Sequence, residues 1–243
     1  MSLYRDRGIV LRTHKLGESD RIITLLTRDH GIVRAVGKGV RKTSSRFGAR
    51  LEPCMHIDVQ FAEGRSLDIV SQVETIDAFA RDLGADYGRY TAATAMLETA
   101  ERVVGEDGGS ASPQYQLLRG ALTALTQQRY TAGLILDSYQ LRSLAIAGYA
   151  PSFGVCAGCG ADGPHRYFHV AHGGVLCEAC TVPGASVPSP FTIALLGALI
   201  AGDWLRVQTS DARARREASS AVSAYLSWHL ERGLRSLPLV DRG

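Results

Sequence analysis

The 243-residue sequence has no hydrophobic run long enough to cross a membrane. Its longest apolar stretch, near residues 191–201, falls short of the roughly 17–25 residues that a transmembrane helix needs. Arg5, Asp6 and Arg7 are followed by no long apolar core, so the N-terminus does not have the pattern of a signal peptide. With 45% hydrophobic and 21% charged residues, the composition is that of a soluble globular protein, and we expect it in the cytoplasm.

The sequence also lacks the motifs of common enzymes. A phosphate-binding loop ending at Lys42-Thr43 would need glycines where Val36 and Arg41 stand, so we expect no nucleotide hydrolysis. No His-Glu-x-x-His motif occurs. A zinc deaminase needs His-x-Glu ahead of its cysteines, whereas His229-x-Glu231 follows them. No Ser/His/Asp signature stands out, and we expect that the protein is not an enzyme.

Acidic residues are missing between Asp29 and Glu52, where basic residues gather. Residues 1–50 carry twelve Lys/Arg and four Asp/Glu, whereas the remainder carries fifteen and twenty. A basic head on a slightly acidic body is typical of a protein that binds a polyanion. The alternative is a solvated loop that is merely basic. The basic residues of this segment are Arg34, Lys38, Arg41, Lys42, Arg46 and Arg50.

Five short runs in residues 1–76 have the patterns of β-strands. Residues 9–13, 22–27 and 32–36 are rich in apolar, β-branched side chains, and residues 55–61 and 67–73 alternate between apolar and polar. Five strands with a long excursion after the third predict a small Greek-key barrel, such as the OB-fold that binds nucleic acids. An SH3-like barrel or a five-stranded sandwich fits the count nearly as well.

From residue 77 the apolar period becomes helical. Ser112-Pro113 and Ser189-Pro190 each have the pattern of an N-cap followed by a first-turn proline. The fold class is therefore α+β, with an OB-fold domain over residues 1–76 and an all-α domain over residues 77–243 that carries a cysteine-rich insertion at 152–188. Gly105 to Ser112 is expected to be a linker. The expected helices cover residues 93–104, 113–125, 134–148, 191–204 and 211–233.

Four of the five cysteines have the spacing of a tetrahedral metal site, in which Cys156-x-x-Cys159 is followed by Cys177-x-x-Cys180. A pair separated by two residues turns both sulfurs toward one point, and two pairs make an S₄ cage. Because such a cage leaves no open position, we expect one structural Zn²⁺ ion; iron, free thiols and a redox role are the alternatives. Residues 167–170 and 175–176 are expected to pair as a hairpin. The loop histidines His165, His169 and His172 are expected to be exposed and not to bind metal.

Several motifs together resemble one family. They are Leu16-Gly17-Glu18-Ser19-Asp20-Arg21, Gly37-Lys38-Gly39, Ser45-Arg46-Phe47-Gly48, Gly148-Tyr149-x-Pro151, Cys156-x-x-Cys159-Gly160 and His229-Leu230-x-x-x-Leu234-Arg235-Ser236. In this order the sequence resembles the RecO family of bacterial recombination mediators, in its four-cysteine group, over nearly the whole chain. The resemblance implies binding of single- and double-stranded DNA, annealing of complementary strands, and action with RecR and the single-strand-binding protein SSB to load RecA.

The candidate DNA-binding residues follow from the charge pattern. The barrel has few aromatic residues on which bases could stack, so phosphate contacts should dominate and binding should be indifferent to sequence and steeply salt-dependent. The first candidates are the six basic residues of the segment 33–50. Arg12, Lys15 and Arg21 come second, because Glu18 and Asp20 lie close to them in sequence. Phe47 is a candidate for base stacking, although a core position is slightly favoured for it.

An apolar groove in the C-terminal half is a hypothesis for partner binding. The helix over residues 191–204 is apolar nearly all round, and basic residues cluster at the start of the last helix, where the helix dipole disfavours positive charge. The SSB tail is acidic and ends in apolar residues, which suits such a groove; solvated arginines are the alternative. The candidate residues are Phe191, Leu195, Trp204, Arg206, Arg213, Arg215 and Arg216.

Two other functions compete with this interpretation. A zinc-ribbon nucleic-acid factor would carry basic charge in its metal loop, but Arg166 is the only Lys or Arg between Cys156 and Cys180. A zinc-stabilised protein–protein scaffold without DNA binding or annealing activity is the second alternative.

Overall fold

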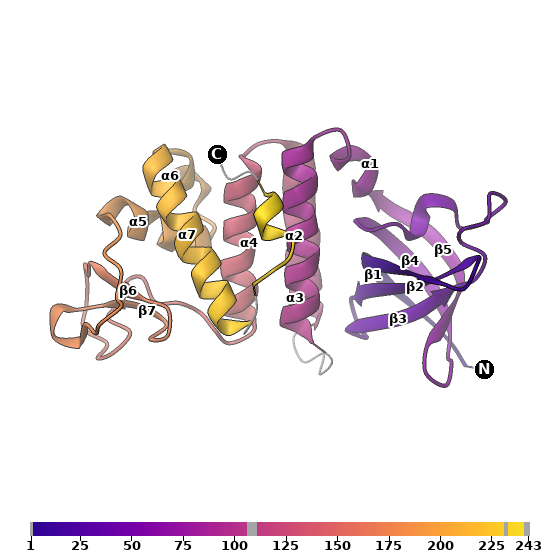
Figure 1. Ribbon diagram of the computed structural model, residues 1–243, viewed down its shortest axis with the longest axis horizontal. Coiled ribbons are helices and arrows are strands. Elements are labelled where there is room, and N and C mark those ends of the chain that lie inside the picture. Colours follow the sequence, from indigo (N-terminus) through magenta and orange to yellow (C-terminus); the bar gives the residue numbers. More distant parts are fainter. Residues whose placement is uncertain (1, 106–110, 231–232, 241–243) are drawn as a thin grey trace. The chain divides into compact units, whose positions relative to one another are not determined.

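The computed structural model describes residues 2–105, 111–230 and 233–240 and divides into two compact units, Met1–Gln127 and Gln128–Gly243 (Figure 1). The first unit begins with five strands: β1 (Leu3–Leu16), β2 (Asp20–Thr27), β3 (Ile32–Gly37), β4 (Met55–Ala62) and β5 (Asp68–Ala78). They form a closed barrel in the order β1-β2-β3-β5-β4, and β1 pairs back onto β4.

The strand pairing confirms the predicted OB-fold. All neighbours are antiparallel except β3 and β5, which run parallel and join at Ala35↔Asp68 and Val36↔Ile69. The alternating apolar residues point inward, where Ile23, Leu25 and Phe61 are fully buried. The period-2 pattern thus fixed the strands, and the long excursion between β3 and β4 contains the short helix η1 (Gly48–Leu51).

Three helices complete the first unit: α1 (Phe79–Leu83), α2 (Tyr87–Val104) and α3 (Ala111–Gln127). Asp86 caps α2 by accepting a hydrogen bond from the Arg89 amide. Buried His56 on β4 links the barrel to α3, since its Nε2 lies 2.6 Å from the Tyr115 hydroxyl and its Nδ1 lies 2.7 Å from Asp77.

The start of α3 differs from the sequence prediction. Helix α3 already includes Ala111 and Ser112, so Ser112 is not its N-cap, because the helix starts before the proline signature. Most of the expected linker, residues 106–110, lies outside the described residues. Strand structure gives way to helix at Ala78, close to the predicted domain boundary after residue 76, which stays a prediction.

The second unit packs four helices: α4 (Ala132–Ile146), α5 (Pro190–Ala201), α6 (Trp204–Gln208) and α7 (Ala212–His229). Leu141, Leu195, Leu199 and Val222 share their buried core. Ser189 caps α5 through the Thr192 amide, as its sequence predicts. A short 3₁₀ turn, η3 (Leu237–Leu239), follows α7.

The sequence misplaced two helix ends in this unit. The helix expected over 191–204 breaks at Gly202, whose φ of 72° is left-handed, and α6 starts afresh after it. The last helix ends at His229 instead of running to Gly233, because Leu230 already forms its C-cap. Within the described residues, no helix has both the length and the apolar character needed to span a bilayer.

Between α4 and α5 lies the cysteine-rich loop, which contains the hairpin β6 (Tyr167–His169) and β7 (Gly174–Leu176) and the turn η2 (Glu178–Cys180). The strands pair antiparallel, as predicted. A side chain at Gly174 would lie 2.3 Å from the Ser152 carbonyl oxygen, so the close approach of these two backbones requires glycine.

Candidate nucleic-acid interface and metal centre

The basic segment forms the excursion from β3 to β4 and is anchored by three apolar residues. Val40, Phe47 and Leu51 are buried in the barrel core, with exposed fractions of 8%, 3% and 0%. Gly37 permits this anchoring, because a Cβ there would lie 2.6 Å from a methyl group of Val40. The polar residues between the anchors therefore face the solvent.

All six first-rank basic residues are exposed, and none of them has a carboxylate within salt-bridge distance among the described residues. Arg41 donates instead to the Gly17 carbonyl, and Arg50 donates to the carbonyl of Arg46. Both acceptors are neutral, so these two contacts do not cancel the charges of Arg41 and Arg50. These residues are Arg34 on β3, Lys38, Arg41, Lys42 and Arg46 on the loop, and Arg50 on η1.

The β1–β2 turn is pinned to this loop. The Arg41 amide donates to the Ser19 carbonyl at 2.9 Å, and the Gly39 amide donates to the Asp20 carboxylate at 2.8 Å. The hydrogen bond from Gly39 lowers the pKa of Asp20 most, and the charges of Lys38 and Lys42 lower it further. Asp20 thus helps to fix the loop while the two lysines stay exposed.

The second-rank candidates differ from one another. Arg12 lies 2.7 Å from Glu101 of α2, and Arg21 lies 2.6 Å from Glu52. Lys15 is exposed near the end of β1. Two of the three are therefore paired with carboxylates, although not with Glu18 or Asp20, whose closeness in sequence had suggested that pairing.

Phe47 takes the core position that the sequence interpretation slightly favoured, and not the stacking role for which it was also a candidate. Only 3% of it is exposed, and it packs inside the barrel. Its ring is not available to stack on a base; the Arg46 guanidinium lies 4.8 Å from the ring centre. The residue anchors the basic loop.

Sequence reasoning missed Arg65. This exposed residue lies in the β4–β5 turn and lines a hollow of about 560 Å³ together with Arg12 and Arg34. The β4–β5 loop is one of the two loops that OB-folds use for ligands, so fold knowledge combined with the turn residues Glu63-Gly64-Arg65 was the signal that could have found it.

The four cysteines of the second unit meet at one point. Their sulfur atoms all lie within 4.8 Å of one another. Tight turns bring each pair together: the Gly160 amide donates to the Cys156 carbonyl at 2.8 Å, and the Cys180 amide donates to the Cys177 carbonyl at 3.2 Å. A Cβ at Gly158 would lie 3.1 Å from the Cβ of Cys180, so a larger residue there would press on that cysteine.

The donor set suits a soft or borderline metal cation. The Cys177 amide lowers the pKa of Cys156 to about 6, which favours a thiolate. Hydrogen bonds that the Cys180 thiol donates to the other three cysteines, the one to Cys177 first, favour its protonated form and raise its pKa to about 12. Four thiolates this close repel one another unless a cation balances them, and four sulfurs are the ligand set of structural metal sites. The cluster is therefore a candidate metal centre.

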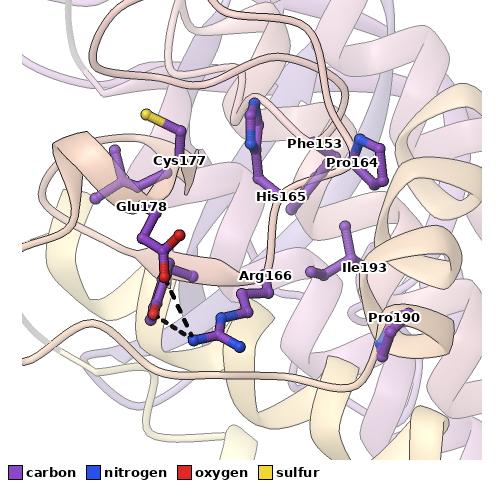
Figure 2. A pocket seen from close by; sticks show the side chains of 10 residues that line it. Phe153, Pro164, His165, Arg166, Cys177, Glu178, Pro190 and Ile193 are labelled. Carbon is purple, nitrogen blue, oxygen red and sulfur yellow. Dashed lines mark hydrogen bonds and ion pairs between the residues drawn. The ribbon is translucent and has the colours of Figure 1, made fainter.

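A pocket of about 460 Å³ lies beside the cysteine cluster. Figure 2 shows Cys177 and Glu178 on one side of it and Pro190 and Ile193 on the other. Its only lining Lys or Arg, Arg166, lies 4.0 Å from Glu178 and donates to the Tyr167 hydroxyl at 2.7 Å. The cation of this pocket is therefore shared with a carboxylate and a hydroxyl that also line it.

A second hollow in this unit, of about 280 Å³, contains three of the predicted partner-binding residues: Phe191, Leu195 and Arg206. Phe191 is 74% exposed and Leu195 is buried. The side chain of Arg206 is 82% exposed and lies 3.3 Å from Asp203. The hollow thus has an apolar floor beside a partly paired arginine, and Asp211 also lines it.

The other predicted residues of the groove have different surroundings. Trp204 stacks on Tyr130 with ring centres 4.3 Å apart. Arg213 lies 2.9 Å from Glu217, and Arg215 donates to Ser210. Arg216 is exposed. None of these four lines the hollow that holds Phe191.

The chain is an OB-fold protein of a defined class, in which a closed barrel with an exposed basic loop is joined to a helical unit with a four-cysteine cluster. The family model described as "Recombination protein O N terminal" matches residues 1–79, and that described as "Recombination protein O C terminal" matches residues 84–238. The chain belongs to the RecO family of DNA repair proteins, which confirms the resemblance seen in its motifs.

Curated relatives match over the full length. The DNA repair protein RecO of Nocardioides sp. is 59% identical over 243 residues, covering 99% of this chain and 100% of the relative. The DNA repair proteins RecO of Streptomyces coelicolor and Thermobifida fusca are each 57% identical, with 100% of both chains covered.

Proposed function

We propose that this protein is a recombination mediator that binds single- and double-stranded DNA, anneals complementary strands and, with RecR, helps to load RecA onto DNA coated by SSB. The observation that carries the proposal is the set of six exposed basic residues, free of salt bridges within the described residues, that lie on β3 and in the excursion from β3 to β4 of an OB-fold barrel. Membership of the RecO family supports it. The proposal places the protein in the cytoplasm, at the nucleoid, and gives it no catalytic activity.

Annealing follows from the kind of contact that this surface can make. Lysine and arginine bind phosphates and leave base edges free, while a shared positive surface lowers the repulsion between two strands. Six phosphate contacts would give a slope of log K against log salt of about −4 on single strands. Weak dependence on base sequence is expected, because the one aromatic ring of the loop, Phe47, is buried.

The proposal includes one structural zinc ion held by Cys156, Cys159, Cys177 and Cys180. Bound there, zinc would balance the thiolate charge and fix the two turns of the cysteine-rich loop. With all four positions occupied by sulfur, the ion would have no site for substrate. Its role is then to hold the loop in shape.

The proposal also assigns the SSB tail to the hollow beside Phe191. Its apolar end would lie against Phe191 and Leu195, and its acidic residues would compete with Asp203 for Arg206. We expect Arg206→Glu to weaken binding of a labelled tail peptide at least 5-fold. Arg166→Glu, in the other pocket, is the matched control. Equal affinity of both variants and the parent protein would contradict the assignment.

The main test is strand annealing measured across a salt series, with and without a chelator. Lys38→Glu, Arg41→Glu and Lys42→Glu are combined in one variant, and Arg81→Glu, Arg119→Glu and Arg129→Glu form the control with the same change in charge. We expect the first variant to lose annealing and DNA binding and the second to keep most of both. If both variants anneal like the parent, the basic loop is not the DNA interface and the scaffold alternative is favoured.

A further inference from the structure

The hollow near Arg65 shares Arg34 with the basic segment and adds Arg12 and Arg65 from other strands and turns. Its floor is the outer face of the barrel, where Arg12 of β1 and Arg34 of β3 both lie in register with Thr24 of β2. Residues in register on neighbouring strands share a face, so the two arginines lie about 10 Å apart on one surface. The hollow therefore presents two cations across a distance that a nucleotide unit could span.

The walls of the hollow come from the β4–β5 turn and the end of α2. Gly64 makes the turn possible, because a Cβ there would lie 1.9 Å from the Leu67 carbonyl oxygen. Asp68 holds the turn in place, accepting from the Gly64 amide at 3.1 Å and from the Tyr4 hydroxyl at 2.5 Å. Both oxygens of this carboxylate accept a hydrogen bond. These two bonds fix the backbone of the turn that carries Arg65.

Among the described residues that line the hollow, Arg12 and Glu101 form the one ion pair. Their side-chain atoms lie 2.7 Å apart, and the side chains are 46% and 24% exposed. Arg34 and Arg65 are exposed and make no salt bridge within the described residues. A carboxylate on Arg12 occupies the position that a phosphate oxygen would take, because both accept from a guanidinium in the same geometry.

We infer that this hollow binds one nucleotide of single-stranded DNA, its phosphate on Arg12, Arg34 and Arg65, and that Glu101 competes with that phosphate for Arg12. The inference rests on the proposed DNA binding and adds a second contact site with an internal competitor. Half-buried Ile32 and Leu67 give the sugar and base an apolar wall. A concave site of this size admits one unstacked nucleotide and not a duplex, so the effect of Glu101 should be specific to single strands.

The test compares Glu101→Gln with Glu98→Gln, which removes the same charge from the same helix but faces Arg102 and does not line the hollow. Binding of a labelled oligothymidine and of a duplex is followed by fluorescence anisotropy across a salt series. We expect Glu101→Gln to bind the single strand about 2- to 5-fold more tightly, the range that an exposed ion pair allows, with little change for the duplex. Glu98→Gln should bind like the parent protein.

A double-mutant cycle isolates the pair. Arg12→Gln should weaken single-strand binding and reduce the salt slope by about 0.7, and Glu101→Gln should give no gain in that background. A gain that persists without Arg12, or that is equal for the duplex, would show a general charge effect and overturn the inference. Melting temperatures of all variants show whether each one is folded, and Glu101→Asp supplies a second variant with a shorter carboxylate.

The two proposals can fail separately. If the parent protein binds DNA through the basic loop but Glu101→Gln does not change the affinity for single strands, Glu101 does not compete with the phosphate. The DNA-binding proposal then stands. If the parent protein does not bind DNA, both are wrong.

Discussion

Replacing Phe47 by alanine would separate the role of this ring as a loop anchor from a role in base stacking. The side chain is 3% exposed and packs with Val40 and Leu51 in the barrel core. Truncating a buried phenylalanine to alanine costs about 3–5 kcal/mol, because it removes apolar burial and leaves a cavity. A natural domain has roughly 5–15 kcal/mol of stability in total, so Phe47→Ala should bring the protein close to unfolding.

Phe47→Leu is the informative variant, since it keeps most of the apolar volume and loses the aromatic face. A hydrophobic replacement of this kind usually costs less than about 1.5 kcal/mol. If the ring only anchors the loop, Phe47→Leu should bind single-stranded DNA with nearly the affinity of the parent protein. A stacked base would instead be worth about 1–3 kcal/mol, a loss of roughly 5- to 150-fold.

Two measurements decide between these outcomes. Urea unfolding followed by circular dichroism gives the free energy of unfolding, and anisotropy with a labelled oligonucleotide gives the affinity at one fixed salt concentration. The anchor role predicts a large loss of stability for Phe47→Ala and unchanged affinity for Phe47→Leu. A Phe47→Leu protein that is stable but binds DNA 10-fold more weakly would refute the reasoning.

Three further predictions follow from other sites. Metal analysis should find one zinc ion per chain. Cys177→Ser should lower both the zinc content and the melting temperature. A full zinc content in this variant would contradict the assignment of the four cysteines as the zinc ligands. Glu217 has its pKa lowered to about 2, first by the Thr192 hydroxyl, so the stability it contributes is present above its ordinary pKa of 4.5 and lost as the pH falls from there toward 2. Glu217→Gln should lower the free energy of unfolding at pH 7 by about 1–2 kcal/mol, a figure reduced because the side chain is 30% exposed. The free energy of unfolding of this variant should also change less with pH between 4.5 and 2 than that of the parent protein. Burial lowers the pKa of His56, so stability should decline as the pH falls below 6.5, and Tyr115→Phe should cost about 0.5–1.5 kcal/mol in urea unfolding at pH 7.

The parts of the fold that the sequence predicted well carry a local periodic signal. Alternation along residues 55–61 specified β4, and Ser189 before Pro190 marked the start of α5. The two Cys-x-x-Cys pairs predicted a cluster that the structure assembles within 4.8 Å. Each of these signals depends on neighbours a few residues apart, where the period or the spacing determines the geometry.

The parts that were missed depend on residues far apart in sequence. Nothing near Arg12 indicates that it meets Glu101, which is 89 positions later. Phe47 stands alone in a glycine-rich loop without a period, so the sequence favoured its core position only slightly over a stacking role. Gly202 inside an apolar run also gave no strong sign of a break, because one glycine is often tolerated within a helix.

The closure of the barrel limits how this protein can recruit others. Every one of its five strands is hydrogen-bonded on both sides, since β1 meets β4 and β3 meets β5. In the proposed role beside other DNA-coating proteins, the paired stretches of these strands offer no open backbone edge to which a foreign strand could be added. Recognition by the barrel is left to side chains, and charged side chains release their partners when salt or a competing anion takes their place.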